Sequence, residues 1–115
     1  MHSQMAYQKK EINSHLLGSD QRLLDFLYDS PTAVSLRDRP EILLDDSWEF
    51  SLDERVLIRA ALDISCGGGL VFLGELLSDL SEKQFECLIK ALTRYREMHQ
   101  SIQIYSGYQK RLENG

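Results

Sequence analysis

Residues 51–95 read SLDERVLIRAALDISCGGGLVFLGELLSDLSEKQFECLIKALTRY, and this stretch decides the fold. Ser51 and Glu54 match a capping box, in which a hydroxyl and a carboxylate satisfy free amides at a helix start. The helix that follows runs to about Ile64 and is apolar on most sides, which is typical of a buried helix. Three glycines at 67–69 end it, and the leucine spacing then predicts a short helix over 73–80.

A second capping-box pattern at Ser81 and Gln84 opens the last helix. Apolar residues follow it at helical spacing, the clearest periodicity in the chain. Where this helix ends is open. Residues 99–115 fit either its continuation or a strand, because Ile102, Ile104 and Tyr105 are good strand formers. We favour a long C-terminal helix, which Gly107 weakens by up to about 1 kcal/mol relative to alanine.

Two series of residues seven apart run along this helix and form a seam of the coiled-coil type. One contains Leu88, Tyr95 and Ile102, and the other contains Ala91, Met98, Tyr105 and Leu112. Either the seam packs against the N-terminal helix of the same chain, or it is a dimer or partner interface. The residues predicted to bind a partner here are Met98, Ile102, Tyr105 and Leu112.

Before residue 51 the sequence patterns that indicate secondary structure are weaker. A thin apolar stripe predicts a helix within residues 1–17, ended by Gly18, and a second helix is expected from about Asp20 to Asp29, ended by Pro31. Pro40 is a further breaker, and residues 41–44 fit either a short strand or one helical turn. Trp48 and Phe50 alternate with polar residues, which predicts extended chain with both rings facing inward over one end of the core.

These elements predict one all-α domain over residues 1–115, with about five helices and at most one short strand or hairpin. Its core spans about 19–98, while segments 1–17 and 99–115 are extended or depend on a partner for order. The expected core residues are Leu24, Leu27, Val56, Leu57, Ala61, Leu62, Leu73, Leu77, Phe85, Leu88, Ile89 and Leu92.

The amino-acid composition limits the classes of protein to which this chain can belong. Apolar residues make up 43% and charged residues 27% of the 115 residues, as in ordinary globular proteins. We expect no membrane segment, because no run approaches the roughly 20 apolar residues that a spanning helix needs. The N-terminus has no apolar region of the secretory type, so Cys66 and Cys87 are expected to be free thiols in the cytoplasm.

The net charge is −5 and is unevenly spread, with −7 in residues 1–80 and +2 in residues 81–115. The densest acidic stretch spans residues 41–54 and contains no basic residue. This is either a solvated surface or a surface that steers a basic partner. The acidic residues predicted to contact a partner are Glu41, Asp45, Asp46 and Glu49.

The sequence favours no catalytic, cofactor or metal site. Asp63, Ser65 and the glycines superficially resemble a calcium loop, but two side-chain oxygens cannot supply a shell of six or more. The same glycines follow a helix and precede no Lys-Ser/Thr pair, so they do not match a phosphate loop. A pairing of Cys66 with His99 as a nucleophile has no support in their spacing, and the three histidines are scattered.

These observations predict a non-enzymatic protein-binding module that binds a protein partner or a second copy of itself. The alternative is a helix-turn-helix nucleic-acid-binding regulator over residues 73–98, since the C-terminal part is basic. Glu82 and Glu86 argue against this alternative, because they lie in the first turns of the second helix, where base contacts would be made.

Overall fold

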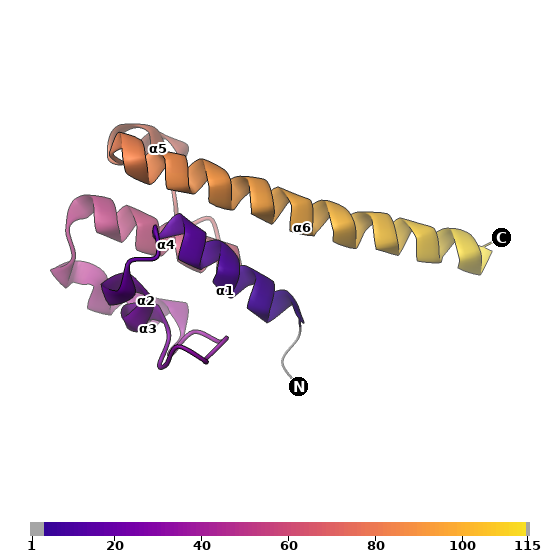
Figure 1. Ribbon diagram of the computed structural model, residues 1–115, viewed down its shortest axis with the longest axis horizontal. Helices are drawn as coiled ribbons and strands as arrows, with labels where there is room; N and C mark the ends of the chain where they lie inside the picture. Colours follow the sequence, from indigo (N-terminus) through magenta and orange to yellow (C-terminus); the bar gives the residue numbers. More distant parts are fainter. Residues whose placement is uncertain (1–3, 115) are drawn as a thin grey trace.

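The computed structural model describes the backbone of residues 4–114 and the side chains of residues 5–100. Over this part the chain is all-α, as predicted, with six α-helices, one 3-10 helix and no strand (Figure 1). The elements are α1 (Gln4–Leu16), α2 (Gln21–Leu27), α3 (Pro40–Asp46), η1 (Ser47–Glu49), α4 (Leu52–Cys66), α5 (Leu73–Ser78) and α6 (Glu82–Asn114).

Helix α4 is the central helix, as its apolar pattern predicts. The backbone N–H of Ser51 donates to the Glu54 carboxylate at 3.1 Å, so the capping box forms. The helix ends at Gly67, whose φ of +68° suits a residue without a side chain. Seven of its side chains are buried, namely Val56, Leu57, Ile58, Ala60, Ala61, Leu62 and Ile64.

Helix α1 packs against both α4 and α6. Its charged Glu11 pairs with Arg94 of α6 at 2.9 Å, and a β-carbon at Gly18 would lie 3.6 Å from the Cys87 sulfur. Residue numbers increase along α1 in the direction in which they decrease along α6, so the two helices are antiparallel (Figure 1). Ile12 and Leu16 of α1 belong to the core, so α1 is part of the packed globule.

Helices α2 and α3 and the 3-10 helix η1 form the rest of the globule. Asp20 caps α2, because its carboxylate accepts the N–H groups of Arg22 and Leu23. Pro40 was expected to break the chain, but it lies in the first turn of α3, where its missing N–H costs nothing. Residues 41–44 are therefore helical, and the prediction of extended chain at 48–50 is wrong for Trp48, which lies in η1.

Helix α6 begins at a complete capping box: Ser81 N–H donates to Gln84 at 2.8 Å, and Gln84 N–H donates to the Ser81 hydroxyl at 3.1 Å. It continues for 33 residues, about 50 Å at 1.5 Å per residue. The alternative of a strand after residue 99 is therefore wrong over the described backbone. Figure 1 shows α6 extending past the N-terminal end of α1.

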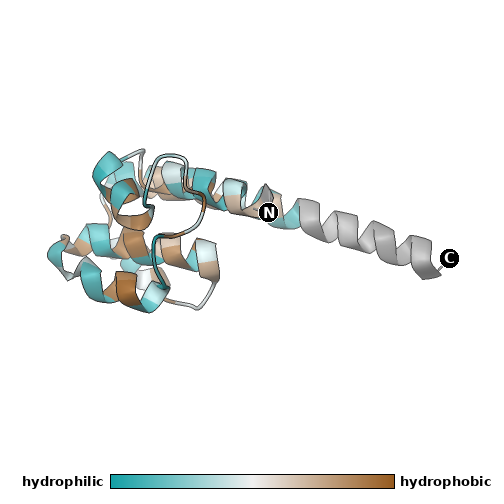
Figure 2. Cartoon of the chain, turned by 90° about the horizontal axis from the view of Figure 1, so that it is seen from below, coloured by the Kyte–Doolittle hydropathy of each residue, from teal (hydrophilic) through white to brown (hydrophobic). Residues whose placement is uncertain are grey.

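Polar and apolar bands alternate along the helices of the globule (Figure 2), and the expected core is only partly correct. Leu27, Val56, Leu57, Ala61, Leu62 and Leu88 are buried, and Leu24 and Phe85 are partly buried. Four expected core residues are instead exposed: Leu73 by 72%, Leu77 by 64%, Ile89 by 46% and Leu92 by 43%. The leucine spacing identified one side of each helix, but not whether another element covers that side.

A buried polar cluster joins α1, the end of α2 and α4. The Asn13 amide nitrogen lies 3.0 Å from the Tyr28 hydroxyl, 2.9 Å from the Ser65 hydroxyl and 3.3 Å from the Ala61 carbonyl. Asn13 is fully buried. Burial raises the pKa of Tyr28, and its hydrogen bonds with Asn13 and Ser65 oppose this rise. The cluster fixes the position of α1 because each partner is costly to leave unsatisfied.

We expect Asn13→Ala to lower the free energy of unfolding by about 1–2 kcal/mol, since the buried Tyr28 hydroxyl and the half-buried Ser65 hydroxyl lose a partner, while the loss of the unpartnered Asn13 Oδ1 offsets part of this cost. Tyr28→Phe should cost about 1 kcal/mol. Urea titration followed by circular dichroism measures both values. As a control, Tyr7→Gln, at a side chain of α1 that is 61% exposed, should change the value by less than about 0.5 kcal/mol. An Asn13→Ala cost as small as that of the control would contradict the role of the cluster.

Asp53 bridges the starts of α4 and α6. Its carboxylate accepts the Ser51 hydroxyl at 2.5 Å and the Gln84 side-chain amide at 2.7 Å. The hydrogen bonds from Ser51 and then Gln84 lower the pKa of Asp53 from its usual 3.8. A lowered pKa in the folded chain stabilises the fold above the unfolded value, and this contribution is lost as the pH falls through the folded value.

We therefore expect Asp53→Asn to lower the free energy of unfolding at pH 7 by no more than about 1 kcal/mol, because the site is partly hydrated. The difference from the unsubstituted chain should shrink as the pH drops below 3.8. Urea titrations from pH 7 to pH 3 measure it, with Asp45→Asn as the matched control on exposed α3. A difference that grows toward low pH would reverse the assigned sign.

Candidate partner-binding surfaces

Within the globule, the face of α6 that carries the seam lies beside α1 at Met98 and beside α4 and α5 at Leu88 and Tyr95. Leu88 and Ala91 are buried there, and Met98 is only 7% exposed. Gln8, Ile12 and Met98 line one shared cavity, so Met98 packs beside α1. Of the four seam residues predicted to bind a partner, the structure thus places Met98 within the fold.

The other seam residues, Ile102, Tyr105 and Leu112, have side chains outside the described ones, while the backbone of α6 continues through them as helix. The register of α1 shows where its cover ends. Glu11 pairs with Arg94, and Gln8 and Ile12 share a cavity with Met98, so the cover of α6 by α1 reaches Met98. Beyond it, Figure 1 shows α6 continuing past the end of α1.

The acidic stretch divides into two groups. Glu41, Asp45, Asp46 and Glu49, the residues predicted to contact a partner, are all exposed on α3 and η1. Asp46 pairs with Arg37 at 3.4 Å, in an exposed geometry that contributes little to stability. The remaining acidic residues of the stretch serve the fold, since Asp53 binds Gln84 and Glu54 caps α4 and pairs with Arg22.

Trp48 lies beside Glu49 and two residues after Asp46 in the chain and is 70% exposed, so the prediction that it plugs the core is wrong. The alternation of aromatic and polar residues places the Trp48 ring inward only if the chain is extended. Trp48 instead lies in η1, a 3-10 helix. Phe50 does pack inward, with its ring 4.9 Å from that of Phe26 in an edge-to-face geometry. An exposed tryptophan beside acidic residues is a surface that sequence reasoning missed, although its four acidic neighbours were visible.

Helix α5 and the adjoining face of α6 form an apolar surface. Phe72, Leu73 and Leu77 are exposed, and a cavity of about 260 Å³ lies between α4, α5 and α6. Its lining is mostly apolar and includes Ile64, Val71, Leu76, Leu92 and Tyr95.

Polar contacts from α4 fix α5, which has no buried residue of its own. Arg59 pairs with Glu75 at 2.6 Å, and the Asp63 carboxylate accepts the N–H groups of Leu70 at 2.8 Å and Val71 at 3.0 Å. These bonds position the segment after the three glycines without requiring apolar contacts on its outer side. This explains how Leu73 and Leu77 can be exposed.

The described residues contain no cluster of three or more His, Cys, Asp or Glu side chains that could hold a metal. Cys66 is exposed and Cys87 is half-buried, and both are free thiols. Among the described helices, none combines the length and apolar character needed to cross a membrane.

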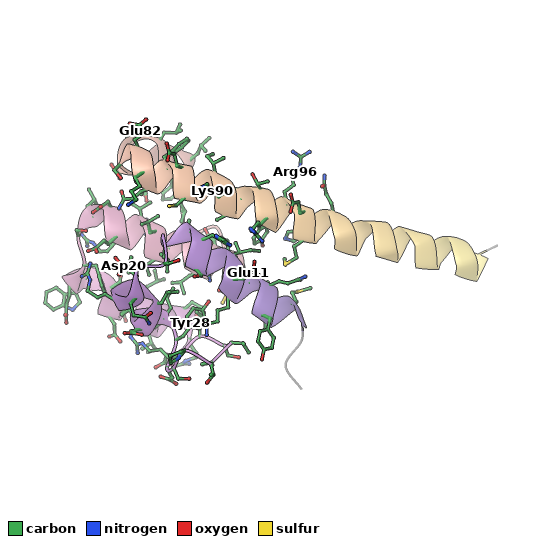
Figure 3. All side chains as sticks on the ribbon, viewed as in Figure 1. Glu11, Asp20, Tyr28, Glu82, Lys90 and Arg96 are labelled. Carbon is green, nitrogen blue, oxygen red and sulfur yellow. The ribbon has the colours of Figure 1, made fainter. Side chains whose placement is uncertain are left out.

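The two helices of the helix-turn-helix alternative do follow one another, as α5 and α6. Of the basic residues on α6, Arg94 is paired with Glu11, and Arg96 points away from α1 (Figure 3). Glu82 lies at the exposed start of α6 (Figure 3).

Comparison with known proteins finds no matching family model, no matching curated protein and no matching solved structure.

Trp48 is the only tryptophan, so its fluorescence reports on this surface alone. We expect caesium ions to quench it more strongly than iodide at equal ionic strength, because the surrounding carboxylates attract cations and repel anions. Asp45→Lys with Glu49→Lys should reverse the order. Stern–Volmer titrations measure this, and weak quenching by both ions would show that the ring is covered.

Proposed function

We propose that this chain is a non-enzymatic protein-binding module acting in the cytoplasm. Its partner contacts the C-terminal part of α6 along the seam that continues from Met98 through Ile102, Tyr105 and Leu112. The exposed acidic residues Glu41, Asp45, Asp46 and Glu49 orient the approach of that partner by charge, which affects association rate and specificity more than affinity.

One observation carries the proposal: α6 continues as helix beyond the residues that α1 covers, and its apolar heptad pattern continues with it. Helices are stabilised in water chiefly by packing an apolar face, and an isolated segment of fewer than about 15 residues is marginal. Ile102, Tyr105 and Gly107 are not strong helix formers. A second helix on the seam would provide the packing that α1 provides nearer the globule.

The exposed apolar residues of α5 and α6 give secondary support. Phe72, Leu73 and Leu77 stand on one short helix and its preceding residue, beside the cavity lined by Leu76 and Leu92. Grouped apolar residues on a surface are typical of protein-interaction sites. Trp48 adds a residue type that is enriched among the residues that dominate binding energy.

We expect Ile102→Asp with Tyr105→Asp to abolish partner binding while helical signal and melting temperature of the globule are retained, because a charge within an apolar seam opposes burial. Gln100→Asp with Gln103→Asp adds the same charges off the seam and should leave binding intact. The measurement is affinity capture from native cells, with and without nuclease, with light scattering of the eluate.

Each other outcome has a distinct meaning. Equal loss of binding in both double variants would refute the seam as the binding surface. Global unfolding of the seam variant alone would show that the seam is part of the intramolecular core. A nuclease-sensitive set of partners, abolished by charge reversal at Lys90, Arg94 and Arg96, would replace the proposal with nucleic-acid binding through residues 73–98.

A further inference from the structure

Residues 70–79 comprise α5 with the residues that flank it, and they cover part of α4 and α6; we call this segment the flap. Three glycines precede it, and their φ values of +68°, +150° and +66° are ones that other residues rarely adopt. A β-carbon at Gly67 or Gly69 would meet no described atom from elsewhere in the chain within 4 Å. The flap is therefore joined to α4 by backbone against which no other described element packs closely.

The apolar contacts beneath the flap are incomplete. No residue of α5 is buried, and Leu70, Val71 and Leu76 are only partly buried against the core. The cavity of about 260 Å³ lies where a close-packed core would have side-chain contacts. Because dispersion and burial both depend on such contacts, closing the flap gains less apolar stabilisation than packing a buried helix would.

Two polar contacts from α4 hold the flap closed, and we call them the latch. Arg59 pairs with Glu75 at 2.6 Å, and each of these side chains is 24% exposed. About one turn further along α4, the Asp63 carboxylate accepts the N–H groups of Leu70 and Val71. The position of the flap thus depends on the latch more than on the burial of its own side chains.

Apolar side chains lie beneath the flap. Ile64 of α4 is 6% exposed and Leu88 of α6 is 2% exposed, and both line the cavity. Leu92 and Tyr95 line the same cavity from α6. A chain whose flap has swung away presents these residues together, as an apolar surface between α4 and α6 that the closed structure hides.

We propose that the flap opens as one unit on the glycine run, while α1, α4 and α6 stay folded. Segments with few buried apolar contacts open at a lower free energy than the whole domain unfolds. The latch then sets how often the apolar surface between α4 and α6 is exposed, so that this surface is a regulated one. The inference does not depend on what the seam binds.

Hydrogen exchange followed by NMR on the unsubstituted chain tests whether the flap opens apart from the globule. The N–H groups of Leu70 and Val71 should exchange at least about tenfold faster than that of Leu62 in the buried middle of α4, and low urea should change their rates little. Exchange at Leu62 should rise steeply with urea, because it requires unfolding of the domain. An identical urea dependence at all three residues would overturn the proposal.

Glu75→Ala tests whether the flap opens as one unit. Removing this half of the latch should speed exchange at the N–H groups of Leu70 and Val71 by about tenfold, although Asp63 rather than Glu75 binds them. Unchanged rates at both groups would show that the two contacts open independently and would contradict the proposal. Glu86→Ala, the same change at an exposed residue of α6, is the matched control and should leave both rates as they are.

Thiol labelling tests whether opening uncovers the wall of the cavity. In a Cys66→Ser, Cys87→Ser background, Ala60→Cys places a thiol in that wall, and Ala61→Cys places one at the next position, outside the cavity. With an aromatic disulfide reagent, Ala60→Cys should react at least about tenfold faster than Ala61→Cys, and adding Glu75→Ala should speed its reaction by about a further tenfold. A rate for Ala60→Cys that Glu75→Ala leaves unchanged would refute the role of the latch.

Discussion

The antiparallel packing of α1 on α6 is the constraint on which the rest of the structure depends. It joins the two ends of the sequence, since Glu11 and Arg94 are 83 residues apart in the chain. It covers Met98 on one side and brings Asn13 to its partners on α4 on the other. Leu88 and Tyr95 of the same helix lie beside α4 and α5.

This arrangement divides α6 into a part that packs within the chain and a part that extends beyond α1. Up to Met98, α6 is a core helix whose seam packs within the chain. Beyond Met98 the apolar pattern continues in the sequence, on a part of α6 that extends past α1 (Figure 1). The two readings of the seam that the sequence leaves open, internal packing and an interface, therefore do not exclude one another. Met98 belongs to the first part, and Ile102 begins the second.

The sequence predicts well those features that depend on residues close together in the chain. Both capping boxes, the central helix and the long last helix follow from residues within a few positions of one another. Burial is less predictable, because it depends on what lies opposite. Leu73 and Leu77 are exposed because α5 is held by Arg59 and Asp63 of α4, contacts that no periodicity reveals. Trp48 was misplaced because inward alternation requires extended chain, and Ser47–Glu49 form a 3-10 helix instead.

The proposed binding couples association to helix formation in the C-terminal part of α6. The residues that make the seam apolar, such as Ile102 and Tyr105, are also residues that lower helix propensity relative to alanine or leucine. A partner must therefore offset the cost of ordering them as well as the cost of association, which lowers affinity for a given buried area. The packed segment up to Met98 reduces this cost, because a helix that is already nucleated extends more readily than one that must begin anew. For the proposed binding, α1 holds the start of the helix in place and so lowers the cost of ordering the part beyond it.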